Sequence, residues 1–187
     1  MKQENRKDEI IHTATKLFKK KGYSAVTMRD IAKSMGIKAA SLYNHINSKQ
    51  EILTNIIISL AEEFTDEMNN ILKSDLNSID KLKEIISLHV KITSENTNGM
   101  ASLNNDWMHL EEKLDYYLSL RHKYEEDFRE IINEGISKKE ISNSNSEIML
   151  FSMLSTLRSL YLWTPNQKDI NELANSLSDV LINGVKI

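Results

Sequence analysis

The sequence predicts an all-α protein of about nine helices, with a three-helix helix-turn-helix head followed by a longer C-terminal helical bundle. Apolar residues recur at spacings of three and four along most of the 187 residues, which is the period of an amphipathic helix. The chain contains one proline and five glycines, so few residues interrupt long helices. Three helix-boundary signals also follow one another between residues 27 and 51.

The first of these signals starts a helix at Thr27 and ends it at Gly36. The Thr27 hydroxyl can accept from free backbone N–H groups of the first turn, and Asp30 stands three residues on, where a capping-box partner belongs. Gly36 tolerates the left-handed conformation of a sharp turn. We therefore expect a helix that spans residues 27–35.

A second helix is expected over residues 38–44, and a third begins at Ser48, where Glu51 completes another capping box. Leu42 and Ile46 face the core of this unit, beside Ile31 and Ile37. The outward group is then Lys38, Ala39, Ser41, Tyr43 and Asn44. This order of helices is typical of a DNA-reading helix-turn-helix.

The same part of the chain carries a net positive charge, whereas the rest carries a net negative charge. Residues 1–50 hold 11 Lys or Arg against 4 Asp or Glu, a balance of +7, whereas the remaining residues hold 13 against 23, a balance of −10. Basic side chains neutralise phosphates, and base contacts supply selectivity. Lys19, Lys20 and Lys21 also suit the end of a helix through its dipole, but this does not explain the overall asymmetry.

Composition excludes several protein classes. The chain has no cysteine, so it has neither a disulfide framework nor a thiolate metal site. No apolar run is long enough to cross a membrane, and residues 1–9 lack the apolar core of a signal peptide. We expect a cytoplasmic protein with no membrane partner. Residues 1–47 are expected to form the DNA-binding domain, and residues 48–187 the effector-binding and dimerisation domain.

The apolar stripes place the later helices. One runs from Lys49 to Leu72, and the next spans residues 79–92 until Asn98-Gly99 interrupts the pattern. Further helices are expected from Met100 past Trp107, from Leu114 to near Gly135, from Glu147 to Trp163, and from Gln167 to Asn183 after Pro165. The helix that starts at Lys49 joins the head to the bundle and would couple the two.

The last two helices predict a dimer interface. The helix over residues 147–163 has an apolar side and an opposite side of small hydroxyl residues, which favours close packing on a second helix. A paired head also reads two half-sites on DNA. Alternatively, both helices complete the monomer core. The predicted interface residues are Ser152, Ser155, Thr156, Ser159, Leu173, Leu177, Val180 and Leu181.

The N-terminal quarter resembles the DNA-binding domain of the TetR/AcrR family of regulators. The resemblance rests on Arg6, Ile10, Ile11, Ala14, Leu17, Phe18, Gly22, Tyr23, residues 27–32, Gly36, Ile37, residues 42–46, Ser48 and Lys49. It implies that Thr27, Tyr43 and Lys49 hold phosphates and that residues 38–44 meet base edges. The full set of expected DNA contacts is Thr27, Arg29, Lys38, Ala39, Ser41, Tyr43, Asn44, His45 and Lys49.

One run departs from the family pattern. Members often carry Ser, Lys, Gly and Thr before the Leu-Tyr pair, whereas this chain has Lys38, Ala39, Ala40 and Ser41. The helix therefore lacks the usual N-cap hydroxyl and one basic contact. The operator sequence of relatives cannot be transferred to this chain.

The bundle offers candidates for an effector site. Arg121 lies within an apolar stripe, where a cation needs an acidic side chain or an anionic ligand. His89 lies on an apolar face, where a histidine is most often a hydrogen-bonded core residue. Methionine and aromatic residues can line an adaptable pocket, although they also form ordinary cores. The candidate ligand-binding residues are His89, Trp107, Tyr117, Arg121, Tyr124, Phe128, Met149 and Met153.

The C-terminal half also resembles a branch of the family associated with lipid metabolism. The residues that carry this weaker resemblance are Asn105, Asp106, Trp107, Arg121, Tyr124, Glu125, Phe128, residues 134–136, Leu162, Trp163 and Pro165. In that branch the effectors are often fatty acyl-CoA thioesters. The resemblance implies a small hydrophobic effector, and a fatty acyl-CoA among the options.

Enzymatic motifs are missing from the sequence. It has no Gly-x-Ser-x-Gly elbow and no glycine-rich phosphate loop, so we expect no enzyme, no catalytic residue and no cofactor. Asp106, His109 and Glu112 are spaced at three and could hold a metal ion, but no second ligand motif accompanies them. Surface charge on a helix explains them better, and we expect no metal site.

These patterns together predict a homodimeric, ligand-responsive repressor that binds a palindromic operator and is released by its effector. Two alternatives remain open from the sequence. One is an activator, or a regulator without a small ligand. The other is a helical module that binds protein partners.

Overall fold

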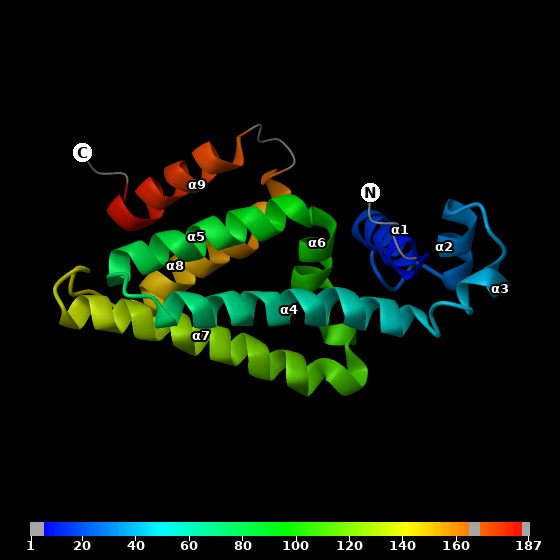
Figure 1. The fold of residues 1–187 in the computed structure, drawn as a ribbon, viewed down its shortest axis with the longest axis horizontal. Coiled ribbons are helices and arrows are strands. Elements are labelled where there is room, and N and C mark those ends of the chain that lie inside the picture. The colour runs from blue at the N-terminus through cyan, green and yellow to red at the C-terminus, as the bar shows by residue number, and fades with distance from the viewer. Residues whose placement is uncertain (1–5, 165–168, 185–187) are drawn as a thin grey trace. The chain divides into compact units, whose positions relative to one another are not determined.

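The computed structural model describes residues 6–164 and 169–184, and all regular structure within these ranges is helical. This confirms the all-α prediction. Figure 1 shows the α-helices in chain order. They are α1 (Arg6–Lys21), α2 (Met28–Ser34), α3 (Ala39–Leu42), α4 (Lys49–Lys73), α5 (Ser78–Glu95), α6 (Thr97–Asn105), α7 (Leu114–Ser137), α8 (Ser146–Arg158) and α9 (Ile170–Ser178). Short 3-10 turns occupy Trp107–His109, Glu111–Lys113 and Leu160–Leu162, and a π-helical turn spans Asp179–Asn183.

The chain packs into two compact units. The first comprises the residues up to Ala61 together with Asn98–Tyr117, and the second comprises Glu62–Thr97 and the residues from Leu118 onward. The segment that contains α6 therefore packs with the head, although it lies far downstream in the sequence. The boundary that we predict between residues 47 and 48 separates a DNA-binding domain from an effector-binding domain. This functional division stays a prediction.

The core of the first unit is formed by the apolar faces of α1, α2 and α3. Ile10, Phe18 and Ile31 are fully buried or nearly so. Leu42 of α3 is also fully buried, and Ile46 in the following loop is 1% exposed. Burial of a side chain of this size stabilises a fold by roughly 1.5–3 kcal/mol, so even the four-residue α3 is held firmly by its one buried leucine.

The second unit is centred on α5. Its apolar face, with Ile85 and Ile86 fully buried, packs on α8, while α9 lies along another side of it (Figure 1). Phe128 and Ile131 of α7 are buried as well. The apolar stripes of α5 and α7 that were identified in the sequence thus face the core of this unit. None of the described helices combines the length and apolar character needed to span a bilayer.

Several helix ends differ from the sequence prediction. The break between α5 and α6 falls at Asn96, whose φ of −137° and ψ of 54° leave the helical region, and Asn98 and Gly99 are helical. The helix predicted from Leu114 to near Gly135 ends at Ser137, and Gly135 itself lies within α7. The α-helix predicted over residues 38–44 is limited to Ala39–Leu42. Trp107 belongs to a 3-10 turn that follows α6.

The C-terminal helices also differ in their ends. The α-helix predicted to reach Trp163 ends at Arg158 and continues as a 3-10 turn. The last α-helix begins at Ile170, with Asp169 as its N-cap. The predicted break at Pro165 and start at Gln167 lie outside the described residues.

Candidate DNA-binding surface and effector core

The N-terminus of α2 carries the predicted capping box. The Thr27 hydroxyl oxygen accepts from the Asp30 N–H at 3.2 Å, and the Asp30 carboxylate accepts from the Thr27 N–H at 2.9 Å. The Thr27 hydroxyl also donates to this carboxylate at 2.6 Å. These hydrogen bonds lower the pKa of Asp30, because they favour its ionised form. The start of α2 is therefore fixed by its own side chains.

The turn between α2 and α3 is closed by Gly36. Its φ of +68° lies in the left-handed region that favours glycine. The Ile37 N–H donates to the Ala32 carbonyl at 3.0 Å, which closes the end of α2. Lys38 occupies the N-cap of α3 and makes no side-chain cap bond. The N-terminus of α3 therefore has no side-chain cap, as the absence of a hydroxyl residue at this position predicted.

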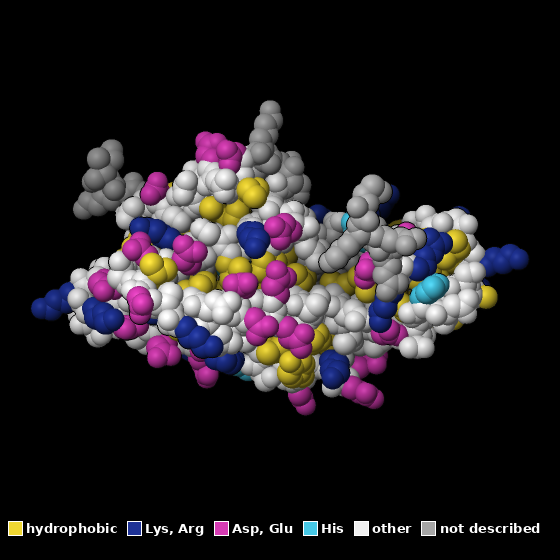
Figure 2. Space-filling view, in the orientation of Figure 1, with side chains coloured by type: hydrophobic (Ala, Val, Ile, Leu, Met, Phe, Trp, Pro, Cys, Tyr) yellow, Lys and Arg dark blue, Asp and Glu magenta, His cyan; other side chains and the backbone are white. Residues whose placement is uncertain are grey.

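The outward residues of this unit form an exposed polar face. Tyr43 is 53% exposed although its neighbour Leu42 is fully buried. Ala39 is half-buried. The other predicted DNA contacts that are exposed are Thr27, Arg29, Lys38, Ser41, Asn44 and His45. Figure 2 shows lysine and arginine side chains on the surface formed by α1 to α3.

Lys49 is a predicted DNA contact whose ammonium group also has partners inside the protein. Its Nζ donates to the Tyr23 carbonyl at 2.8 Å and lies 4.1 Å from the centroid of the Tyr23 ring. Next to it, the Ser48 hydroxyl accepts from the Glu51 N–H at 3.0 Å, as the capping pattern predicted. The Glu51 carboxylate, however, accepts from the Asn47 N–H instead of the Ser48 N–H.

In the second unit, two candidate ligand residues form a buried polar pair. His89 of α5 and Tyr124 of α7 are 3% and 6% exposed, and the His89 Nε2 lies 2.9 Å from the Tyr124 hydroxyl. The ring of Phe64 lies 4.6 Å from the His89 ring. Burial, followed by the charge of Arg158, lowers the pKa of His89 to about 3. This histidine is neutral at physiological pH.

Arg121 forms a salt bridge with an acidic side chain, which is the alternative to an anionic ligand that the sequence left open. Its Nε donates to Glu125 at 3.1 Å, and Arg158 of α8 donates to the same carboxylate oxygen at 2.6 Å. Burial alone would raise the pKa of Glu125, but the hydrogen bonds from Arg158 and Arg121 outweigh it and lower the pKa overall. Two cations thus share one carboxylate near the buried pair.

The structure distributes the other candidate ligand residues over different places. Phe128 is fully buried on α7. Trp107 and Tyr117 belong to the first unit, where their ring centroids lie 5.9 Å apart. Met149 and Met153 line a groove of about 450 Å³, together with residues of α5, α7 and the π-helical turn.

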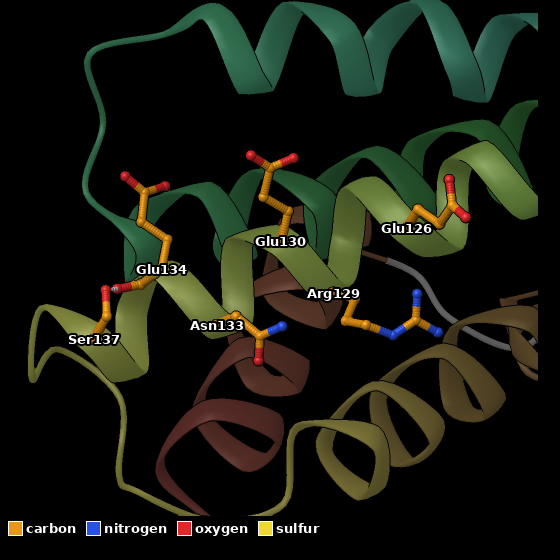
Figure 3. Close-up of a pocket in the computed structure, with 6 residues that line it drawn as sticks. All are labelled: Glu126, Arg129, Glu130, Asn133, Glu134 and Ser137. Atoms are coloured by element: carbon orange, nitrogen blue, oxygen red, sulfur yellow. Dashed lines mark hydrogen bonds between the residues drawn. The ribbon is translucent and has the colours of Figure 1, made fainter.

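A further hollow lies on the surface of α7 (Figure 3). It is open, has a volume of about 700 Å³, and is lined by Glu126, Arg129, Glu130, Asn133, Glu134 and Ser137. These six residues come from the outer face of a single helix, and Arg129 is paired with Glu147 of α8. The described residues contain no group of three His, Cys, Asp or Glu side chains placed to hold a metal ion, so Asp106, His109 and Glu112 do not form one.

The predicted interface residues of α8 are exposed in the isolated chain. Ser152, Ser155, Thr156 and Ser159 face solvent, and the hydroxyls of Thr156 and Ser159 donate to carbonyls one turn earlier. On α9 and the following turn, Val180 is 52% exposed, whereas Leu173, Leu177 and Leu181 are half-buried.

Sequence reasoning missed the large apolar side chains on this surface. Phe151 is 70% exposed and Ile148 is 62% exposed on α8, and Leu162 and Trp163 are 62% and 67% exposed just beyond it. Contiguous exposed apolar residues commonly mark an interaction surface. The signal was present in the sequence, because Ile148 and Phe151 are spaced at three outside the stripe that faces the core.

Comparison with known proteins gives matches along most of the chain. A family model described as bacterial regulatory proteins, tetR family, matches residues 10–56. A model described as the tetracyclin repressor-like C-terminal domain matches residues 75–185.

Individual relatives agree with these models. The chain is 26% identical to the HTH-type transcriptional repressor KstR2 of Rhodococcus jostii over 70% of this chain and 65% of that protein. It is 42% identical to the biofilm operon regulator IcaR of Staphylococcus aureus over 43% of each chain. The chain thus spans less than two thirds of either curated relative. The structure of the ketosteroid regulator KstR2 of Mycobacterium tuberculosis has the same fold, with a TM-score of 0.88 at 17% identity over 98% of this chain and 96% of that one.

Proposed function

The chain belongs to the tetR family of bacterial regulatory proteins, and we propose that it is a homodimeric repressor that binds a palindromic operator and is released by a small effector. The matched families and relatives are regulators of transcription and not enzymes. The observation that carries the proposal is the exposed polar face of α3, which is held in place by the buried Leu42 and Ile46.

The proposed DNA contacts divide into two roles. Lys38, Ser41 and Asn44 would meet base edges, because they are exposed on or beside α3. Thr27, Tyr43 and Lys49 would hold phosphates. The basic balance of residues 1–50 would add affinity that falls as salt concentration rises. The proposed DNA-binding domain is residues 1–47, and such a protein would act on the chromosome in the cytoplasm.

A second copy of the chain would cover the apolar surface of α8. A head this small reads DNA well when a second head occupies the next half-site, about 34–36 Å along the duplex. The exposed Phe151 and Ile148 supply the apolar centre that such an interface needs. The hydroxyl residues beside them allow close helix approach, since Thr156 and Ser159 already donate within their own helix.

The effector would bind in the helical body, from residue 48 onward. The Rhodococcus jostii relative is named a repressor, and the Mycobacterium tuberculosis neighbour is titled a ketosteroid regulator. For this chain, we propose a small hydrophobic or acyl-type effector. The buried His89–Tyr124 pair and the partly exposed cations on Glu125 supply polar anchors in and beside an apolar core.

The experiment that tests the proposal combines DNA binding with assembly. A gel shift with the DNA upstream of the gene should show one sequence-specific complex, and sedimentation should give a dimer mass. Phe151→Glu should give a monomer and weaken the complex, because charge replaces apolar contact at the interface. Glu126→Gln, a change on the exposed face of α7, is the control. Binding that is equally strong on unrelated DNA would contradict the proposal.

A further inference from the structure

Tyr23 holds together three separate parts of the first unit. It lies in the turn between α1 and α2. Its hydroxyl donates to Gln50 of α4 at 2.7 Å, and its ring stacks on the His109 ring with centroids 5.2 Å apart. Gln50 in turn donates to the His109 carbonyl at 2.6 Å. Lys49 binds the Tyr23 carbonyl and lies over its ring.

Asp106 completes this arrangement, which we call the Tyr23 cluster: Tyr23, Lys49, Gln50, Asp106 and His109. The Asp106 carboxylate accepts from the Tyr23 backbone N–H. Burial raises its pKa, and the charges of His109 and Lys49 act in the opposite direction. The cluster therefore docks residues 106–109, which follow α6, on the turn that precedes α2.

Within the cluster, Lys49 is the side chain for which Tyr23 and DNA phosphate would compete. Its ammonium carries the positive charge that faces the Tyr23 carbonyl and attracts Asp106. The same side chain is a proposed phosphate contact. A phosphate carries a negative charge, so it offers the Lys49 ammonium an ionic attraction that the neutral Tyr23 carbonyl does not. DNA would therefore draw Lys49 away from Tyr23.

We propose that Lys49 exchanges between the Tyr23 cluster and DNA phosphate, so that DNA binding loosens the docking of residues 106–109 on the head. The inference rests on the proposed function, because it needs DNA at the head. Coupling of this kind is reciprocal. Stable docking of residues 106–109 on the head then opposes DNA binding. A substitution that weakens this docking but retains Lys49 should therefore increase the affinity for DNA.

Amide hydrogen exchange tests the inference directly. The readout is the exchange of the His109 and Leu110 N–H groups, which donate to Asp106 and Trp107 carbonyls. The probe is a 30-base-pair duplex from upstream of the gene. In the wild-type chain, duplex should accelerate this exchange by about tenfold, the effect of losing one hydrogen bond. In Lys49→Met the exchange should already be fast and should not respond to duplex.

A matched lysine and a second readout make the test decisive. Lys113→Met is the control, since Lys113 lies 5.8 Å from the Tyr116 ring, outside the cluster. Lys49→Met should also lower the salt slope of DNA binding by about one, as for one lost phosphate contact. Tyr23→Phe, which removes only the bond to Gln50, should tighten DNA binding.

The outcomes separate the two proposals. If the duplex binds specifically but leaves exchange at His109 and Leu110 unchanged in the wild-type chain, the exchange of Lys49 is overturned and the proposed function stands. An unaltered salt slope of DNA binding in Lys49→Met would likewise overturn the exchange of Lys49 and leave the proposed function standing. If no specific DNA complex forms at all, both proposals fail.

Discussion

The hydroxyl of Tyr124 lies 2.9 Å from the Nε2 of His89, and both side chains are almost completely shielded from water. Burial of a histidine disfavours its charged form. The folded protein therefore keeps His89 neutral at pH values where an unfolded chain would protonate it, and this difference links stability to pH.

The first prediction concerns this linkage. The pKa of His89 is about 3 in the folded protein against 6.5 ordinarily. As pH falls below 6.5, the unfolded chain gains a proton that the folded chain does not, so the free energy of unfolding should fall by up to about 1.4 kcal/mol per pH unit. Urea unfolding between pH 7 and 5 should show a shallower dependence in His89→Gln. His122→Gln, at an exposed position of α7, should retain the wild-type slope.

The second prediction concerns the carboxylate shared by Arg121 and Arg158. Glu125→Gln keeps the shape of the side chain but removes its charge, so both guanidinium groups lose their ionic contact with this carboxylate. The free energy of unfolding should fall by about 1.5–3 kcal/mol. Because the pKa of Glu125 is lowered, the difference from wild type should shrink as pH falls below about 4.5. Glu126→Gln is the neighbouring control, and equal losses in the two variants would contradict the prediction.

The third prediction concerns Gly135 in α7. A Cβ at this position would lie 2.6 Å from Ile141 Cδ1 and 2.8 Å from Ser78 Cβ. Alanine normally stabilises a helix by about 1 kcal/mol relative to glycine, but overpacking costs about 1–3 kcal/mol. Gly135→Ala should therefore lower the melting temperature. Asn133→Ala, at an exposed site of the same helix, should not lower the melting temperature. A higher melting temperature in Gly135→Ala would contradict the prediction and show that Ser78 moves aside.

The fourth prediction separates base contacts from phosphate contacts. Asn44→Ala should change the preferred DNA sequence, whereas Tyr43→Ala should weaken binding to all sequences alike. Selection from a random DNA pool, followed by titration of the winning duplex, measures both effects. An unchanged preferred site in Asn44→Ala would remove that residue from base readout.

The sequence allowed the local features of the fold to be predicted. The Thr27–Asp30 capping box and the turn at Gly36 depend on residues within a few positions of each other, so the pattern alone indicates them. The packing role of Gly135 could not be predicted from the local pattern, although α7 ends two residues beyond it, at Ser137. Glycine there serves a close approach to Ser78, which is distant in sequence, and does not end the helix.

Long-range contacts of the candidate sites could not be predicted in the same way. The His89–Tyr124 pair joins two helices whose packing no local pattern specifies. The exposure of Phe151 likewise depends on which face of α8 packs on α5. The placement of Lys49 over Tyr23 requires that the turn after α1 returns to the first turn of α4.

The bond from Gln50 to the carbonyl of His109 spans 59 positions in the chain. During synthesis, α1, α2 and α3 therefore leave the ribosome well before the segment that packs against them. A nascent chain passes through a stage in which the helix-turn-helix is complete but its tether to residues 106–109 has not yet been translated. A stalled chain that ends before residue 98 would carry the DNA-facing helices without that tether.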